Sequence, residues 1–108
     1  MDLVIELCIC PREVADQIAR EVVEKRLAAC VDMLPNAWGL YGWKDSPYVN
    51  DEVTLLINTC EDWSEELYET IIDLHPSQMP VIVTIAIDES YSRYIQWLQQ
   101  QLLGVEAE

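Results

Sequence analysis

The stretch LVIELCICPREVADQIAREVVEKRLAACVDML, residues 3–34, determines the fold because the spacing of its apolar residues changes twice. From Leu3 to Ile9 every second residue is apolar, which predicts a β-strand. From Pro11 to about Ala28 apolar residues recur at helical spacing, and proline suits the first position of a helix. A second apolar run begins at Ala28. The stretch therefore predicts a strand, a helix and a second strand.

The second apolar run continues to Trp43, with an interruption at Pro35. Because proline cannot donate a hydrogen bond within a sheet, we expect one long, bent strand with a bulge near Pro35. Residues 44–50 are expected to form a loop. Alternating apolar residues from Val53 to Ile57 then predict a third strand that pairs with the second as a hairpin.

The remaining third of the chain predicts two helices and one strand. Thr59 and Asp62 have the spacing of a capping box, and an amphipathic helix follows from Trp63 to Leu74. Residues 81–87 are apolar on both faces, which predicts a central strand. A last helix is expected over residues 90–103, with Gly104 as its C-terminal cap.

The predicted order is β-α-β-β-α-β with an additional C-terminal helix. This is the α+β, ferredoxin-like arrangement, in which both connecting helices cover one face of an antiparallel sheet. We expect residues 1–108 to form a single domain. The other sheet face is expected to lack a cover within the chain, which predicts assembly with copies of itself.

Composition excludes several classes of function. Apolar residues make up 51% of the chain, as in globular proteins, and the net charge is −14 from 6 basic and 20 acidic residues. Such a charge disfavours binding to nucleic acids and to anionic membranes. The sequence has no apolar run long enough for a membrane span, and its N-terminus lacks the features of a signal peptide. We therefore expect a cytoplasmic protein.

The four cysteines, Cys8, Cys10, Cys30 and Cys60, form no Cys-x-x-Cys pair. In a cytoplasmic protein they are expected to stay reduced. Cys8 and Cys10 are two residues apart, so a strand places both side chains on the same face. Two interpretations are open for them, as small buried hydrophobic residues or as metal ligands.

Six segments in order resemble the CutA family of divalent-cation tolerance proteins. The most specific is EKRLAACVDMLP, residues 24–35, and the match extends over nearly the whole chain. The other five are Leu7–Pro11, Leu40–Trp43, Glu52–Thr59, Leu74–Pro76 with Pro80, and Tyr94–Leu98. The resemblance implies a ferredoxin-like, PII-like subunit in a tight homotrimer. It also implies small-ligand clefts between subunits, with Tyr41, Trp43, Glu52 and Trp97 as the candidate residues here.

The resemblance also implies a copper or other divalent-metal site at Cys8 and His75. Cys10 is a candidate third ligand, because Val81 stands where the family commonly has a glutamate. Thiolate and imidazole are ligands that copper prefers. The alternative is that His75, the only histidine, simply ends a helix, where a partly positive ring interacts well with the helix dipole.

No motif for catalysis is present, neither a phosphate loop nor a nucleophile elbow nor a His-Glu-x-x-His sequence. We therefore expect a non-enzymatic protein of divalent metal (copper) tolerance or response. The alternatives are a PII-like sensor that binds a small ligand between subunits and a trimeric scaffold for another protein.

Overall fold

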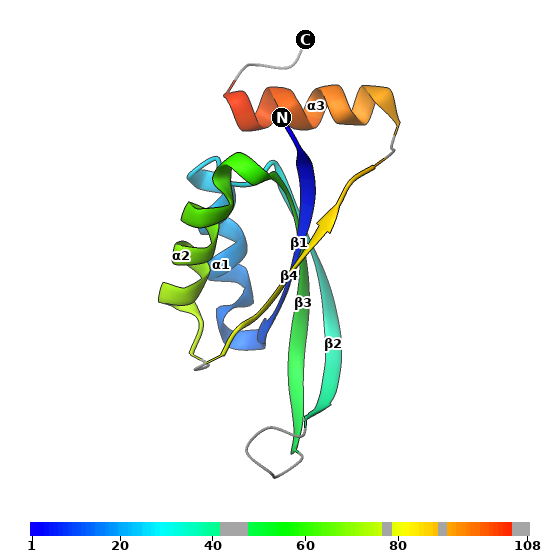
Figure 1. The fold of residues 1–108 in the computed structure, drawn as a ribbon. Helices are drawn as coiled ribbons and strands as arrows, with labels where there is room; N and C mark the ends of the chain where they lie inside the picture. The colour runs from blue at the N-terminus through cyan, green and yellow to red at the C-terminus, as the bar shows by residue number, and fades with distance from the viewer. Residues whose placement is uncertain (42–47, 77–78, 89–90, 105–108) are drawn as a thin grey trace.

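The computed structural model describes residues 1–41, 48–76, 79–88 and 91–104. Within these residues the chain forms one four-stranded sheet and three α-helices, with a short 3-10 turn before the second helix (Figure 1). In chain order the elements are β1 (Leu3–Pro11), α1 (Arg12–Glu24), β2 (Cys30–Tyr41), β3 (Tyr48–Cys60), η2 (Glu61–Trp63), α2 (Ser64–Leu74), β4 (Val81–Ala86) and α3 (Ser92–Leu103). The predicted order of elements is confirmed.

The first helix is shorter than its apolar spacing predicted. Pro11 is the last residue of β1, and α1 begins at Arg12 and ends at Glu24. Two residues later Arg26 has a φ of 57°, a left-handed conformation that ends the helix. The amides of Leu27 and Ala28 both donate to the Val22 carbonyl, at 2.9 and 3.1 Å, so this turn closes the helix end.

The sheet is antiparallel throughout, in the order β2-β3-β1-β4. This order places β1 and β3 in the centre and β4 at an edge, where it pairs with β1 only. The prediction that residues 81–87 form a central strand is therefore wrong. Their apolar character on both faces has another cause: one face packs under the helices through Ile82, while Val83 and Ile85 lie on the opposite, open face.

The hairpin of β2 and β3 extends beyond the rest of the sheet as a two-stranded arm (Figure 1). Pairing between β1 and β3 stops at Pro11 and Glu52, whereas β2 and β3 stay paired up to Tyr41 and Tyr48. The predicted bulge is confirmed, because the register shifts between Leu34 and Ala37. The third strand starts earlier than predicted, at Tyr48, and the loop residues 42–47 lie outside the described residues.

Both α1 and α2 pack on the same face of the sheet and enclose the main core (Figure 1). Its buried members are Cys8, Cys10, Ala15, Ile18, Val22, Leu27, Ala28, Val53, Leu55, Ile57, Leu67 and Ile71. The strand residues among them alternate with residues that point to the opposite face. On that open face Val83 and Ile85 remain 49% and 44% exposed.

The last helix, α3, lies across the end of the sheet where β1 begins (Figure 1). Leu98 and Leu102 pack there against Leu3 and Cys60 in a second, smaller core. The expectation that nothing in the chain covers the open face is therefore wrong for this end. Gly104 caps α3 in the left-handed conformation, with a φ of 74°, as predicted.

The predicted capping box is also wrong. Thr59 is fully buried, and its hydroxyl donates to the Leu27 carbonyl at 2.6 Å. The 3-10 turn η2 then separates Thr59 from α2, which starts at Ser64 without a side-chain cap. Tertiary contact with the turn after α1 thus replaces the local cap that the spacing suggested.

None of the helices in the described parts of the chain has the length and apolar character needed to cross a bilayer.

Candidate functional site

The soft metal-ligand candidates gather toward the end of β1 that precedes α1. Because side chains alternate along a strand, Cys8 and Cys10 point to the same face, beneath α1 and α2. Neither thiol is exposed to solvent. Cys8 lies opposite Leu55 of β3 and Cys10 lies opposite Val53, and all four residues belong to the main core. The expected shared face is confirmed, and it is the buried one.

The two thiols interact with each other. A hydrogen bond from Cys8 to Cys10, together with burial, raises the pKa of Cys8 above its ordinary value. The same hydrogen bond lowers the pKa of Cys10, against the effects of burial and of the negative charges on Glu52 and Glu13. Cys8 is thus held as a thiol, and a metal that binds both sulfur atoms must displace its proton.

His75 reaches the same end of β1 from the end of α2. Its amide caps the helix by donating to the Ile71 carbonyl at 2.8 Å, and its side chain is 8% exposed. Its Nε2 atom lies 2.9 Å from the carbonyl oxygen of Ile9, the residue between the two cysteines. A carbonyl oxygen only accepts, so Nε2 carries the proton and donates here. His75 therefore ties the end of α2 to β1.

The three predicted ligands are thus brought to one region of the fold. No group of three or more His, Cys, Asp or Glu side chains in the described residues has the arrangement of a metal centre. A metal at Nε2 of His75 would have to break the bond to Ile9. The region supplies soft ligands of the right type, in a packing that holds at least Cys8 protonated.

The predicted cleft residues lie apart within one chain. Glu52 is buried at the base of the arm, opposite Pro11 at the end of β1. Trp97 belongs to α3, at the beginning of β1, where its ring stacks on Tyr94 with 6.1 Å between centroids. Tyr41 ends β2 at the far end of the arm, and Trp43 lies outside the described residues. A cleft that uses both Glu52 and Trp97 would need two chains.

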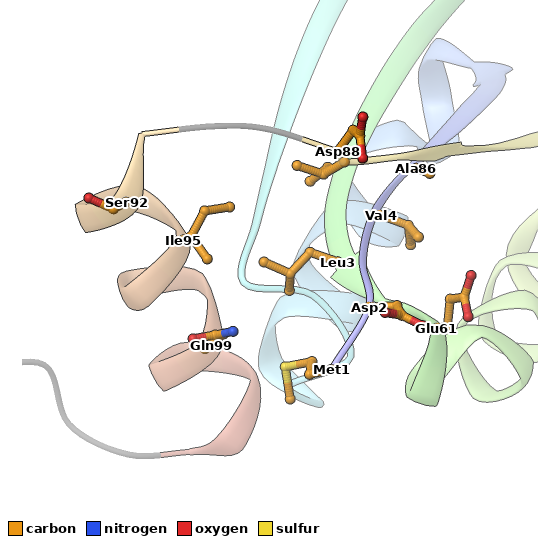
Figure 2. Close-up of a pocket in the computed structure, with 11 residues that line it drawn as sticks. Met1, Asp2, Leu3, Val4, Glu61, Ala86, Asp88, Ser92, Ile95 and Gln99 are labelled. Atoms are coloured by element: carbon orange, nitrogen blue, oxygen red, sulfur yellow. The ribbon is translucent and has the colours of Figure 1, made fainter.

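A different hollow, of about 910 Å³, opens between α3 and the strands β1 and β4 (Figure 2). Its lining residues include the apolar Leu3 and Ile95 and the acidic Asp2, Glu61 and Asp88. Glu52 and Trp97, the two predicted cleft residues whose side chains the structure describes, are not among its lining residues. These three carboxylates disfavour the binding of phosphates and other anions there.

A polar cluster beneath α2 was not predicted from the sequence. Glu6 on β1 is completely buried, and the Thr84 hydroxyl of β4 donates to its two carboxylate oxygens at 2.7 and 2.9 Å. The Tyr68 hydroxyl of α2 lies 2.9 Å from Thr84 Oγ1. The signal was present in the sequence, because Glu6 shares its strand face with Val4, Cys8 and Cys10, which are apolar or weakly polar.

Comparison with known proteins agrees with this fold. Residues 4–101 match the family model described as the CutA1 divalent ion tolerance protein. Protein CutA from Homo sapiens is 36% identical over 92 residues, which are 84% of this chain and 51% of that protein. The divalent-cation tolerance protein CutA from Thermus thermophilus is 35% identical over 100 residues, 93% of this chain and 97% of that protein. The chain thus spans about half of the human relative and nearly all of the bacterial one.

Solved structures show the same architecture. The divalent cation tolerance protein from Thermus thermophilus superposes with a TM-score of 0.85 at 36% identity, over 89% of this chain and 94% of that one. The PII-like protein CutA from Nostoc sp. PCC 7120 gives a TM-score of 0.83 at 32% identity, over 94% and 97%. The family model covers most of the chain, and the fold superposes closely on a solved member, so the chain belongs to the CutA1 divalent ion tolerance family.

Proposed function

We propose that this protein acts in divalent-cation tolerance by binding a soft metal ion, copper above all, and that it does so without catalysis. The observation that carries the proposal is the meeting of Cys8, Cys10 and His75 at one end of β1, through the bond between the His75 ring and Ile9. Thiolate and imidazole together favour copper over hard cations.

Metal binding at this place would be coupled to proton release. Because hydrogen bonding and burial raise the pKa of Cys8, the thiol must lose its proton to the metal. Apparent affinity is therefore expected to rise with pH. The net charge of −14 supports the proposal in a general way, since it concentrates cations near the surface.

The proposed assembly is a homotrimer in the cytoplasm. Two features support it. Val83 and Ile85 are exposed on the open sheet face, and the arm of β2 and β3 extends beyond the other two strands of the sheet. Exposed apolar surface of this kind is typical of a protein–protein interface. A cytoplasmic location is supported by the free thiols of Cys8, Cys10 and Cys60 in the two cores, because cysteines generally stay reduced in the cytosol.

Anaerobic titration with Cu(I) against a competing chelator tests the metal site. Wild-type protein is expected to bind stoichiometrically, and Cys8→Ser and Cys10→Ser are each expected to abolish tight binding. His75→Gln keeps a side-chain hydrogen-bonding group and is expected to weaken binding. Cys30→Ser is the matched control, because Cys30 lies on β2, outside the β1 cluster, and its loss should leave binding unchanged. Equal affinity in all five proteins would contradict the proposed site.

A second candidate function is a PII-like sensor with a small ligand between subunits. It is favoured by the positions of Glu52 and Trp97 at opposite ends of β1, since two chains could bring them together where one cannot. A thermal-shift screen of nucleotides and other small metabolites tests it, because a specific ligand must raise the melting temperature. Loss of that shift in Trp97→Leu would support the cleft, and an unchanged shift would argue against it.

A further inference from the structure

Glu6 is a buried carboxylate in surroundings that supply no positive charge. Its side chain is 0% exposed, between Val4 and Cys8 on the same face of β1 and opposite Ile57 of β3. No lysine or arginine occurs in β1, β3, β4 or α2, which carry its strand and hydrogen-bond partners, and the two arginines of α1, Arg12 and Arg20, are exposed. Within α2 the charged residues are all acidic: Glu65, Glu66, Glu69 and Asp73. A buried carboxylate without a compensating charge is strongly unfavourable.

The polar partners of Glu6 among the described residues are two hydroxyl groups. Thr84 Oγ1 lies 2.7 Å from one carboxylate oxygen and 2.9 Å from the other. Tyr68 Oη lies 3.5 Å from Glu6 and 2.9 Å from Thr84. Among the described residues, the polar groups that meet this buried carboxyl group are therefore neutral hydroxyls, and neither of them supplies a positive charge.

Four oxygen atoms converge here from three elements. Both carboxylate oxygens come from β1, one hydroxyl from β4 and one from α2. Oxygen atoms are the ligands that Mg²⁺ and Ca²⁺ prefer, and Mg²⁺ in particular uses one or two carboxylates with water in the remaining positions. Thr84 is exposed and Tyr68 is half-buried, so the hydroxyl side of the cluster meets solvent in the single chain, whereas Glu6 itself lies beneath it.

We propose that Glu6, Thr84 and Tyr68 form a binding site for a hard cation of the Mg²⁺ and Ca²⁺ class. The cation would neutralise the buried carboxylate and join α2 to β4. The site differs in place and chemistry from the sulfur ligands on β1, and the proposal does not rest on copper binding there.

Thermal unfolding of metal-stripped protein, titrated with MgCl₂ or CaCl₂ at constant ionic strength, tests this site. The melting temperature of the wild type is expected to rise and to saturate with added cation. Glu6→Gln keeps the size of the side chain and removes its charge, so the saturable rise should disappear. Glu69→Gln is the matched control, because it removes one exposed charge from α2 and should keep the rise. An equal rise in the wild type and Glu6→Gln, or no rise in the wild type, would overturn the proposal.

A second pair of variants keeps the test decisive should Glu6→Gln fail to fold. Thr84→Val removes the hydroxyl and is expected to raise the midpoint cation concentration by about tenfold, whereas Thr84→Ser retains the hydroxyl and the wild-type midpoint. Tb³⁺ serves as a luminescent probe of the same site. Its emission, excited through aromatic side chains, should be displaced by Ca²⁺ and should fall in Tyr68→Phe. Identical midpoints in the two Thr84 variants would count against the site.

Discussion

The buried hydroxyl of Thr59 joins two parts of the chain that are far apart in sequence. It donates to the carbonyl of Leu27 at 2.6 Å and so holds the turn after α1 against the end of β3. Thr59 has no exposed surface, so if its hydroxyl were removed, a water molecule could not donate to the Leu27 carbonyl in its place without rearrangement. The contact fixes where the chain re-enters the sheet as β2.

Replacing Thr59 with valine should therefore cost stability. Thr59→Val keeps the shape of the side chain and leaves a buried carbonyl without this donor, with an expected loss of about 1–3 kcal/mol in the free energy of unfolding. Thr70→Val is the control, because the Thr70 hydroxyl only returns to the Glu66 carbonyl within α2. Chemical denaturation of both variants measures the difference, and equal losses would argue against a special role for Thr59.

Tyr94 couples stability to alkaline pH. Burial and a contact with Cys30 raise the pKa of its hydroxyl to about 12, above the ordinary 10, and the hydroxyl donates to Asn58 at 3.1 Å. The folded state therefore holds this proton more tightly than the unfolded state does. Its contribution to stability is complete below pH 10 and is lost as the pH rises toward 12.

Tyr94→Phe should flatten this part of the pH profile. The wild type is expected to lose stability between pH 10 and 12 more steeply than the variant, as measured by denaturant unfolding at a series of pH values. Tyr91→Phe, at a position that is 67% exposed, is expected to keep the wild-type profile. Parallel profiles for the wild type and Tyr94→Phe would show that this proton does not contribute.

At the scale of elements, the end of α1 depends on one unusual backbone conformation. Arg26 is the one described non-glycine residue with a positive φ, 57°, and its guanidinium lies 3.5 Å from the Gln101 carbonyl at the end of α3. The left-handed conformation is unfavourable for a residue with a Cβ atom, whereas the long, exposed contact with Gln101 is weak. The local preference of Arg26 thus opposes this turn. The burial of Leu27 and Ala28 directly after it stabilises the turn instead.

Glycine at this position should stabilise the protein. Arg26→Gly is expected to raise the free energy of unfolding by about 0.5–1 kcal/mol, since glycine adopts this conformation without steric cost. Lys25→Gly is the control: Lys25 has the right-handed helical conformation, and glycine there should lower stability by a similar amount. A loss of stability in Arg26→Gly would mean that the contact with α3 outweighs the backbone strain.

At the scale of the whole molecule, the open sheet face distinguishes this chain from a domain whose sheet is covered on both faces by its own helices. The helices α1 and α2 leave that face apolar, and α3 covers only the end near Leu3. Val83 and Ile85 stay exposed on the edge strand β4. An edge strand with an apolar face is a surface that proteins normally cover with another chain.

A charge placed on this face should disrupt the proposed trimer. Wild-type protein is expected to have a mass near three times the 12.5 kDa of the chain in size-exclusion chromatography with light scattering. Ile85→Glu should shift it toward a single chain, because burying an unpaired carboxylate at an interface is unfavourable. Ile72→Glu adds the same charge on the outer side of α2, where Ile72 is 54% exposed, and should leave the mass unchanged. A trimer that survives Ile85→Glu would place the interface elsewhere.

The sequence by itself determined the order of the elements, the bulge near Pro35, the cap at Gly104 and the family. Each of these depends on residues that are close together in the chain, where spacing and local conformation carry the information. It also placed Cys8 and Cys10 on one face, because alternation along a strand is local.

Only the tertiary structure decided the rest. β1 and β4 are apolar on both faces, so their patterns could not show that β4 lies at an edge or that Glu6 and the two thiols face the helices. Thr59 matched a capping box, yet its hydroxyl donates to the Leu27 carbonyl. The sequence also did not show that α3 packs on the sheet face opposite the other helices. These outcomes depend on contacts between residues distant in sequence, and the free energy of packing whole layers overrides local preference.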